Sequence, residues 1–244
     1  MSRKKMPKIE GFNRMPNGVN NDTEWKGKWC ERFGNDHPIV LEIGCGKGDL
    51  ALGLARLHPD KNFIGVDIKG VRLYSGARRA LTEELHNVQF LRCDIHGIGL
   101  FFAPQEISEI WITFPDPFPK KGQTRNRLTN EIFLAQYARI LAPGGKLYLK
   151  TDNTSLFAYT LDHLAELEQK AVFQVDIYHH VTDLHQSDLT NPDNGVITDY
   201  ERRFLDMGKP ICYLELSLVE GPNLDSVPLT EKVALVTDEK APRG

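Results

Sequence analysis

Residues 38–57 contain an apolar run, a glycine-rich turn and a helical segment in direct succession. They read Pro38-Ile-Val-Leu-Glu-Ile-Gly-Cys-Gly-Lys-Gly48, followed by Asp49-Leu-Ala-Leu-Gly-Leu-Ala-Arg-Leu57. This order is typical of a buried strand, a tight turn and a helix. Glycines in such a turn let the backbone approach a ligand closely, and the N-terminus of the helix offers free N–H groups. The segment therefore predicts an α/β protein with a ligand site at this turn.

The alternation of strand and helix continues along the chain. Together with residues 38–43, seven strands are expected, the others at 63–66, 88–91, 110–114, 146–150, 173–178 and 211–217. Helices are expected at 49–57, 69–85, 128–141 and 153–169, with a short one from about Asp199. This spacing predicts a Rossmann-like three-layer α/β sandwich: a mostly parallel seven-stranded sheet with helices on both faces. Ligands of such sheets bind outside the carboxyl ends of the strands.

Composition excludes several other classes of protein. The chain has 244 residues, of which 41% are hydrophobic and 26% charged, as in ordinary globular proteins. The four cysteines form no CxxC pair, which argues against a disulfide framework and a structural zinc site. His179, His180 and His185 lack the further ligands that would complete a metal site. With no apolar run that suggests a membrane span and no secretion signal, a cytoplasmic protein is expected.

Positive charge is unevenly distributed. The net charge is −3, from 30 Lys and Arg against 33 Asp and Glu, which alone argues weakly against a nucleic-acid-binding protein. Residues 181–244 hold 6 basic and 12 acidic side chains, so residues 1–180 hold 24 and 21. Two basic clusters stand out, namely Arg3, Lys4, Lys5 and Lys8, and then Lys120, Lys121, Arg125 and Arg127. Such a cluster can bind phosphate whatever the net charge.

The glycine-rich turn does not match the common nucleotide fingerprints. Counting from Gly44, the sixth position of a G-x-G-x-x-G pattern is Asp49, although Gly46 and Gly48 fall at alternate positions. No Gly-Lys-Ser or Gly-Lys-Thr sequence follows either. A nicotinamide oxidoreductase of the same fold is therefore disfavoured.

Acidic residues follow three successive strands. Glu42 precedes the glycine-rich turn, Asp67 ends the second expected strand, and Asp94 follows the third. Carboxylates would repel a pyrophosphate, whereas they suit a ligand with an ammonium group, ribose hydroxyls and an adenine amino group. S-adenosylmethionine has these groups. We expect Asp67 to bind the ribose, Asp94 the adenine edge and Glu42 the methionine end.

The fourth strand runs into a proline-rich loop, Thr113-Phe-Pro-Asp-Pro-Phe-Pro-Lys-Lys121. Three prolines in five residues fix the backbone and remove amide donors, so they present Asp116 rigidly at the tip of the strand. Residues 122–127 are basic and polar, and no acidic residue occurs from 117 to 130. Contact with phosphate is the natural use of such a segment.

These features resemble the tRNA (guanine-N7)-methyltransferase family. The motifs that carry the resemblance are Leu41-Glu-Ile-Gly-Cys-Gly-Lys-Gly48, Phe63-Ile-Gly-Val-Asp67, Pro115-Asp-Pro-Phe-Pro-Lys-Lys121, Lys150-Thr-Asp152 and Thr198-Asp-Tyr-Glu201. They occur in the family's order over about residues 38–217. Two departures are Phe118, where the family usually has Trp, and 122–124, where its run is more basic and contains histidines.

The resemblance implies roles for individual residues. Asp116 would be catalytic and would also contact the cofactor. The other cofactor residues would be Glu42, Gly44, Gly46, Gly48, Asp67 and Asp94. Substrate contacts would fall on Lys120, Asp152, Thr198, Asp199, Tyr200 and Glu201, and RNA contacts on Lys121, Arg125 and Arg127. Residues 1–36 lack clear periodicity and are rich in Asn, Gly and Pro, so we expect a partly flexible basic arm with one short helix at about 25–32. Residues 37–219 would form the methyltransferase domain and 220–244 a tail.

The implied reaction is methyl transfer from S-adenosylmethionine to N7 of a guanosine in the tRNA variable loop, leaving S-adenosylhomocysteine. N7 carries a lone pair and no proton, so positioning matters more than a general base. Asp152 and Glu201 are candidates to accept hydrogen bonds from the guanine N1–H and N2–H, and Asp116 to stabilise the cationic product. A small-molecule methyltransferase and a non-catalytic RNA-binding subunit remain alternatives, as do monomer and homodimer.

Three features also have plain structural interpretations. Thr198 or Asp199 could simply cap a helix that has Glu201 in its first turn. Cys45 is interpreted as a small residue that fits the turn. Trp25 and Trp29, four residues apart, are expected to pack a helix rather than to stack on bases.

Overall fold

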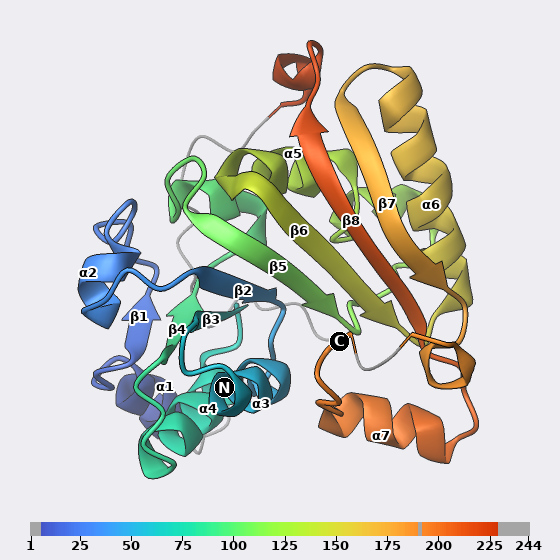
Figure 1. Ribbon diagram of the computed structural model, residues 1–244. Helices are drawn as coiled ribbons and strands as arrows, with labels where there is room; N and C mark the ends of the chain where they lie inside the picture. Colours follow the sequence, from blue (N-terminus) through green and yellow to red (C-terminus); the bar gives the residue numbers. More distant parts are fainter. Residues whose placement is uncertain (1–5, 190–191, 229–244) are drawn as a thin grey trace. The chain divides into compact units, whose positions relative to one another are not determined.

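A computed structural model describes residues 6–189 and 192–228, and they fold as alternating strands and helices (Figure 1). The strands are β1 (Gly18–Asn20), β2 (Ile39–Ile43), β3 (Asn62–Asp67), β4 (Val88–Arg92), β5 (Ile107–Thr113), β6 (Leu141–Thr151), β7 (Phe173–Val181) and β8 (Cys212–Glu220). The α-helices are α1 (Met6–Phe12), α2 (Trp29–Phe33), α3 (Asp49–Leu57), α4 (Gly70–Thr82), α5 (Glu131–Ile140), α6 (Thr154–Gln169) and α7 (Asp199–Asp206). Short 3₁₀ helices are η1 (Ile95–Leu100), η2 (Lys121–Asn126), η3 (Leu184–Gln186) and η4 (Leu224–Ser226). Among the described residues, no helix is both long and apolar enough to cross a membrane.

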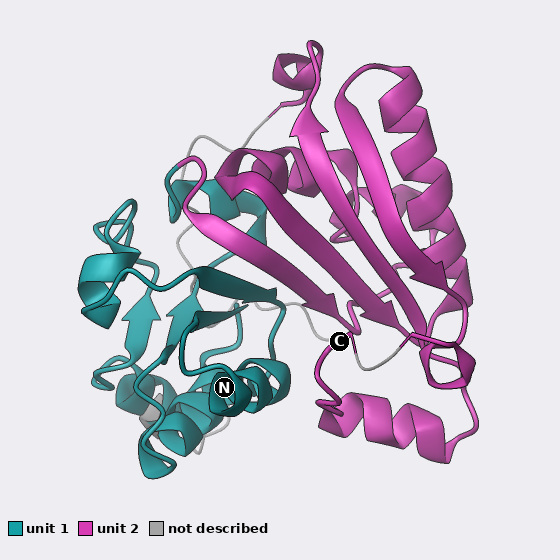
Figure 2. Ribbon diagram, viewed as in Figure 1, with its two compact units in different colours: residues 1–103, 230–244 teal, residues 104–229 magenta. Residues whose placement is uncertain are grey.

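The described residues divide into two compact units (Figure 2), unit 1 up to Ala103 and unit 2 from Pro104 onward. In unit 1 the strands are ordered β1-β4-β3-β2, and every neighbouring pair is parallel. Ile43 lies opposite Val66, which lies opposite Leu91, so the carboxyl ends of β2, β3 and β4 meet at one edge. The parallel arrangement arises because α3 and α4 return the chain between successive strands.

Unit 2 has the strand order β5-β6-β8-β7. β5 and β6 are parallel, with Thr113 opposite Lys150, whereas β8 runs antiparallel to both β6 and β7. Figure 1 shows α5 and α6 on one face of these strands and α7 beyond the carboxyl ends of β5 and β6. Asp116 and Asp152, two candidate functional residues of unit 2, follow the carboxyl ends of β5 and β6.

The core confirms the expectation for Trp29. Its side chain is fully buried, its indole N–H donates a hydrogen bond to the carbonyl oxygen of Phe101 at 3.0 Å, and its ring stacks on Phe102. Trp25 is only partly buried and lies under the guanidinium of Arg32, 4.7 Å from the ring centroid. Both tryptophans therefore have partners within unit 1.

The α/β class with mostly parallel strands is confirmed, but the expected number of strands is wrong. The described residues contain eight strands instead of seven, because Gly18–Asn20 pairs with β4 at an edge. A strand of three residues is too short to show alternation. The helix expected at 128–141 is shorter at both ends, because Asn130 caps α5 and β6 begins directly after Ile140.

The two chain ends are only partly described. Residues expected to form an arm contain α1, β1 and α2, and Lys8 is exposed, whereas Arg3, Lys4 and Lys5 lie outside the described residues. The expected tail begins on unit 2, since the Gly221 N–H donates to the Val172 carbonyl oxygen at 2.9 Å. Residues 229–244 lie outside the described part.

Candidate active site

The glycine-rich turn has a backbone that favours glycine at all three of its glycines. Gly44, Gly46 and Gly48 have φ angles of 72°, 59° and 70°, in the left-handed region. A Cβ on Gly48 would lie 2.6 Å from the ring of Phe90, whereas one on Gly46 would meet nothing within 4 Å. The protein's own packing thus requires the small residue at Gly48, and Gly46 leaves its side open. Cys45 is buried, and burial raises the pKa of its thiol well above the usual value, which disfavours the reactive thiolate form.

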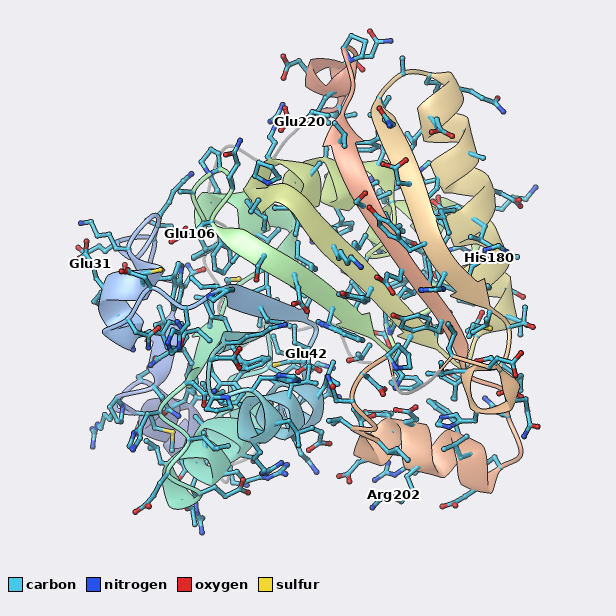
Figure 3. All side chains as sticks on the ribbon, in the orientation of Figure 1. Glu31, Glu42, Glu106, His180, Arg202 and Glu220 are labelled. Atoms are coloured by element: carbon cyan, nitrogen blue, oxygen red, sulfur yellow. The ribbon has the colours of Figure 1, made fainter. Side chains whose placement is uncertain are left out.

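Glu42 lies on β2, next to the first turn of α3 (Figure 3). Its side chain is nearly fully buried, and Oε2 accepts a hydrogen bond from the Ala51 N–H at 3.0 Å. Because Gly48 precedes the helix and has no side chain to cap it, Glu42 satisfies this free N–H from the neighbouring strand. Glu42 therefore fixes the start of α3 below the turn.

Asp67 ends β3 and grips the glycine-rich turn. Its Oδ2 accepts a hydrogen bond from the Gly46 N–H at 3.0 Å, and its Oδ1 accepts one from the Lys69 N–H at 2.8 Å. Burial raises the pKa of this carboxyl, partly offset by these two hydrogen bonds and by Arg72, whose guanidinium lies 3.9 Å away. Each carboxylate oxygen has two lone pairs, so Asp67 can still accept hydrogen bonds from hydroxyl groups.

Asp94 follows β4, and its pKa is lowered, whereas that of Asp67 is raised. The Nδ1 of His96 lies 2.9 Å from its Oδ1, and the His96 backbone N–H donates to the same oxygen at 3.0 Å. The side-chain hydrogen bond lowers the pKa of Asp94, outweighing partial burial. Asp94 thus keeps a negative charge at the edge where Glu42 and Asp67 also lie.

The carboxylates of unit 1 together form a site that can accept hydrogen bonds from a ligand. The turn, Glu42, Asp67 and Asp94 lie at the carboxyl ends of adjacent parallel strands. A ligand that presents N–H and O–H donors and a positive charge fits them, and one that presents a pyrophosphate does not. Among the described residues, no group of three or more His, Cys, Asp or Glu is arranged to hold a metal ion.

In unit 2, Asp116 is exposed on the loop that follows β5. The loop has unusual backbone on both sides of it, since Phe114 and Phe118 have φ angles of 48° and 42°. Non-glycine residues in this left-handed region are strained and cluster at functional sites. The Phe114 N–H donates to the Lys150 carbonyl oxygen at 2.8 Å, which ties the loop to the end of β6.

The basic residues after Asp116 differ in their surroundings. Lys120, Lys121 and Arg125 are exposed, and within the described parts of the chain their side chains form no hydrogen bond or ion pair. Arg127 instead points inward and donates hydrogen bonds to the carbonyl oxygens of residues 117 and 118. The residues expected to contact RNA thus lie in one segment, but Arg127 points towards the protein and not towards solvent.

The expected substrate residues lie at the carboxyl end of β6 and on α7. Oδ2 of Asp152 forms an ion pair with Nζ of Lys209 at 2.7 Å. Thr198 caps α7, its hydroxyl accepting a hydrogen bond from the Glu201 N–H at 3.2 Å. Asp199 and Tyr200 are exposed on the first turn of this helix. The helix-cap interpretation of this segment is confirmed and is compatible with substrate contact.

Glu201 lies in a buried ionic network that the sequence did not reveal. Lys150 is fully buried, and its Nζ contacts carboxylate oxygens of Asp193 and, at 2.7 Å, of Glu201. The other Glu201 oxygen lies 3.0 Å from Nε2 of His185. The signal that could have indicated this network is the lysine at the end of an apolar strand, because a buried ammonium requires a carboxylate.

Known proteins share the sequence of this chain over most of its length. A family model described as "Putative methyltransferase" matches residues 36–214. The tRNA (guanine-N(7)-)-methyltransferase of Christiangramia forsetii is 46% identical over 202 residues, covering 82% of this chain and 88% of that protein. A protein of the same name from Cytophaga hutchinsonii is 38% identical over 223 residues, covering 90% of this chain and 99% of its own.

Solved structures share the fold at low sequence identity. The 16S rRNA methyltransferase KamB superposes with a TM-score of 0.57 at 14% identity, covering 80% of this chain and 93% of that chain. The 16S rRNA (adenine(1408)-N(1))-methyltransferase of Catenulisporales acidiphilia also gives 0.57, at 19% identity and with the same coverage. These likenesses confirm the Rossmann-like methyltransferase fold, and the curated relatives define the family. The chain belongs to the tRNA (guanine-N(7)-)-methyltransferase family.

Proposed function

We propose that this protein transfers a methyl group from S-adenosylmethionine to N7 of a guanosine in tRNA. The observation that carries the proposal is the placement of Asp116, an exposed carboxylate on a constrained loop at the carboxyl end of β5. Family membership supplies the substrate, and we place the guanosine in the variable loop and the enzyme in the cytoplasm, where tRNA is modified.

Unit 1 would hold the cofactor. We assign the ribose hydroxyls to Asp67, which retains free lone pairs, and the adenine edge to Asp94. The open side of Gly46 leaves room for the methionine end, and Glu42 supports this place through α3. S-adenosylmethionine, when bound, supplies a methyl group on a positively charged sulfur.

Unit 2 would hold the guanosine. The N7 lone pair forms a bond to the methyl carbon while the carbon–sulfur bond breaks and its electron pair remains on sulfur. No proton moves, so we assign no general base. Asp116 would stabilise the positive charge that develops on the guanine ring, because a fixed carboxylate needs no reorganisation as this charge appears.

Two acidic residues are candidates to recognise the Watson–Crick edge of guanine. We favour Asp152, because only one of its oxygens is engaged by Lys209, over Glu201, which is fully buried with both oxygens engaged. Asp152→Asn should then raise KM for tRNA without a change in stability. Glu201→Gln should instead mainly lower the melting temperature of the protein.

We assign the exposed residues Lys120, Lys121 and Arg125 to the tRNA backbone. Lys120 could also contact the guanosine, given its place next to the proline-rich loop. Neutralising all three should lower the log–log slope of tRNA affinity against salt by roughly 2–3 units, since each phosphate contact contributes roughly 0.7–0.9. An unchanged slope would remove them from the interface.

The test is methyl transfer from labelled S-adenosylmethionine to unmodified tRNA, followed by nucleoside analysis. We expect 7-methylguanosine, and cleavage of the tRNA at the modified base with borohydride and aniline should locate it in the variable loop. Asp116→Ala should lower kcat about 10²–10³-fold, much more than it weakens binding of S-adenosylmethionine. Asp176→Ala, which removes an exposed aspartate on β7, is the matched control and should be as active as the wild type. Transfer that persists in Asp116→Ala would refute the role of this carboxylate.

A further inference from the structure

The loop around Asp116 needs support from outside itself. Its flanking residues Phe114 and Phe118 both have left-handed backbone, which is strained for residues other than glycine and persists only where neighbouring structure enforces it. The three prolines of the loop have no N–H and therefore cannot donate hydrogen bonds within the loop. The carbonyl groups on the loop must therefore find donors elsewhere.

The first flank is held by unit 2's own strand and helix. The Phe114 N–H bonds to the Lys150 carbonyl oxygen at 2.8 Å, and its ring lies 5.6 Å from that of Phe204 on α7. These contacts fix the loop where it leaves β5. They leave the side that follows Asp116 without support.

Arg127 supports that second flank. Its Nε donates to the Pro117 carbonyl oxygen at 3.1 Å, and its Nη2 donates to the Phe118 carbonyl oxygen at 3.1 Å. One planar guanidinium thus engages two successive carbonyl groups directly after Asp116. A guanidinium suits this geometry because its N–H groups form a rigid fork.

Arg127 is in turn held in place. Its guanidinium carbon lies 4.1 Å from the centroid of the Tyr159 ring on α6, a cation–π contact. Its backbone N–H bonds to the Thr124 carbonyl oxygen, and its carbonyl accepts from the Asn130 N–H, next to the start of α5. The arginine therefore connects the Asp116 loop to two helices of unit 2.

We propose that Arg127 is a positioning residue that fixes the backbone of Asp116, rather than a contact to RNA. The inference rests on the proposed function for its effect on catalysis. It changes the expectation drawn from the basic cluster, in which Arg127 would bind phosphate like its neighbours. Arg125, two residues earlier, is exposed and provides the internal comparison.

The decisive variants keep the positive charge. Arg127→Lys retains the charge but cannot present a fork to two carbonyls, whereas Arg125→Lys retains everything that a phosphate contact requires. We expect Arg127→Lys to lower kcat about 10–100-fold, as misplacement of a reacting group by about 1 Å does. KM for tRNA and the salt dependence of binding should stay at the wild-type values. Arg78→Lys, at an exposed arginine on α4 with no assigned role, should match the wild type in kcat, and Arg125→Ala should change the salt slope instead.

A second readout does not depend on methyl transfer. The amides of Phe114 and Gln123, on either side of the loop, donate hydrogen bonds to the carbonyl oxygens of Lys150 and Lys120. Their hydrogen exchange should accelerate more than about tenfold in Arg127→Lys and remain unchanged in Arg125→Lys, because the loop opens more often once the guanidinium no longer holds its carbonyl groups. Wild-type rates of kcat and exchange in Arg127→Lys would overturn the inference, as would an altered salt slope with normal exchange. If the wild-type protein fails to methylate tRNA, the proposed function fails, and the exchange rates still decide whether Arg127 holds the loop.

Discussion

Removal of the ammonium group of Lys150 is the sharpest test of the forces inside unit 2. Lys150→Met keeps the length and apolar character of the side chain but leaves the carboxylates of Asp193 and Glu201 without their shared cation. All three residues are at most 5% exposed. Water cannot replace the lost partner at that depth.

The expected loss of stability is large. Removing one partner of a buried ion pair typically costs about 3–5 kcal/mol, because a charge remains buried without compensation. For a chain of this size, 1 kcal/mol shifts the melting temperature by about 2–4 °C, so Lys150→Met should melt roughly 6–20 °C below the wild type. Thermal unfolding followed by circular dichroism measures this shift.

A lysine on the same strand provides the control. Lys146 forms an ion pair with the buried Glu215, but the lysine side chain is 37% exposed, so water can take its place, and the carboxylate keeps a hydrogen bond from the Tyr213 hydroxyl. Lys146→Met should therefore cost only about 1 kcal/mol. Combining Lys150→Met with Glu201→Gln should destabilise less than the sum of the two single variants, since one buried charge disappears. Equal melting temperatures for Lys150→Met and Lys146→Met would refute the reasoning.

Three further predictions concern the turn, the acidic edge and the cap of α7. Gly48→Ala should lower the melting temperature, measured by calorimetry, because its Cβ would lie 2.6 Å from Phe90 and its φ of 70° is strained for alanine; a wild-type melting temperature would contradict this. His96→Ala should raise the pKa of Asp94 towards its ordinary value, as followed by NMR titration of the carboxyl carbon. The folded-state pKa of Asp94 is depressed, so the stability it contributes is present above pH ~4 and is lost as the pH falls through the folded-state pKa. The difference in free energy of unfolding between the wild type and His96→Ala should therefore narrow below pH ~4. A difference that widens there would contradict the assignment. Thr198→Ala should cost about 1 kcal/mol in denaturant unfolding and Thr198→Ser much less, because only the hydroxyl caps the helix.

The sequence predicted the parts of the fold that repeat a regular pattern. Apolar runs followed by turns identified β2, β3 and β4, and their succession with helices implied parallel strands whose carboxyl ends meet. β1 escaped because pairing with β4, not its own three residues, makes it a strand. Local pattern thus predicted elements, whereas an edge strand depends on a partner distant in the chain.

The positions of side chains were predictable only where the backbone decided them. Asp67 and Asp94 had to lie at strand ends, whatever their rotamers. Arg125 and Arg127 carry the same charge two residues apart, and nothing in the composition of the segment separates them. The difference arises from Tyr159, which lies more than thirty residues later and offers its ring to only one of them.

The same distinction clarifies what positive charge does in this protein. A cation that binds RNA must remain solvated until phosphate replaces water, so its side chain should lack internal partners. The exposed side chain of Lys121 has none among residues 6–189 and 192–228. A cation that positions a catalytic loop must already be engaged, as Arg127 is by two carbonyl groups and an aromatic ring. Counting charges in the segment overstates its affinity for RNA for this reason. Under our proposal, the engaged arginine contributes instead to the rate of methyl transfer, through the geometry of Asp116.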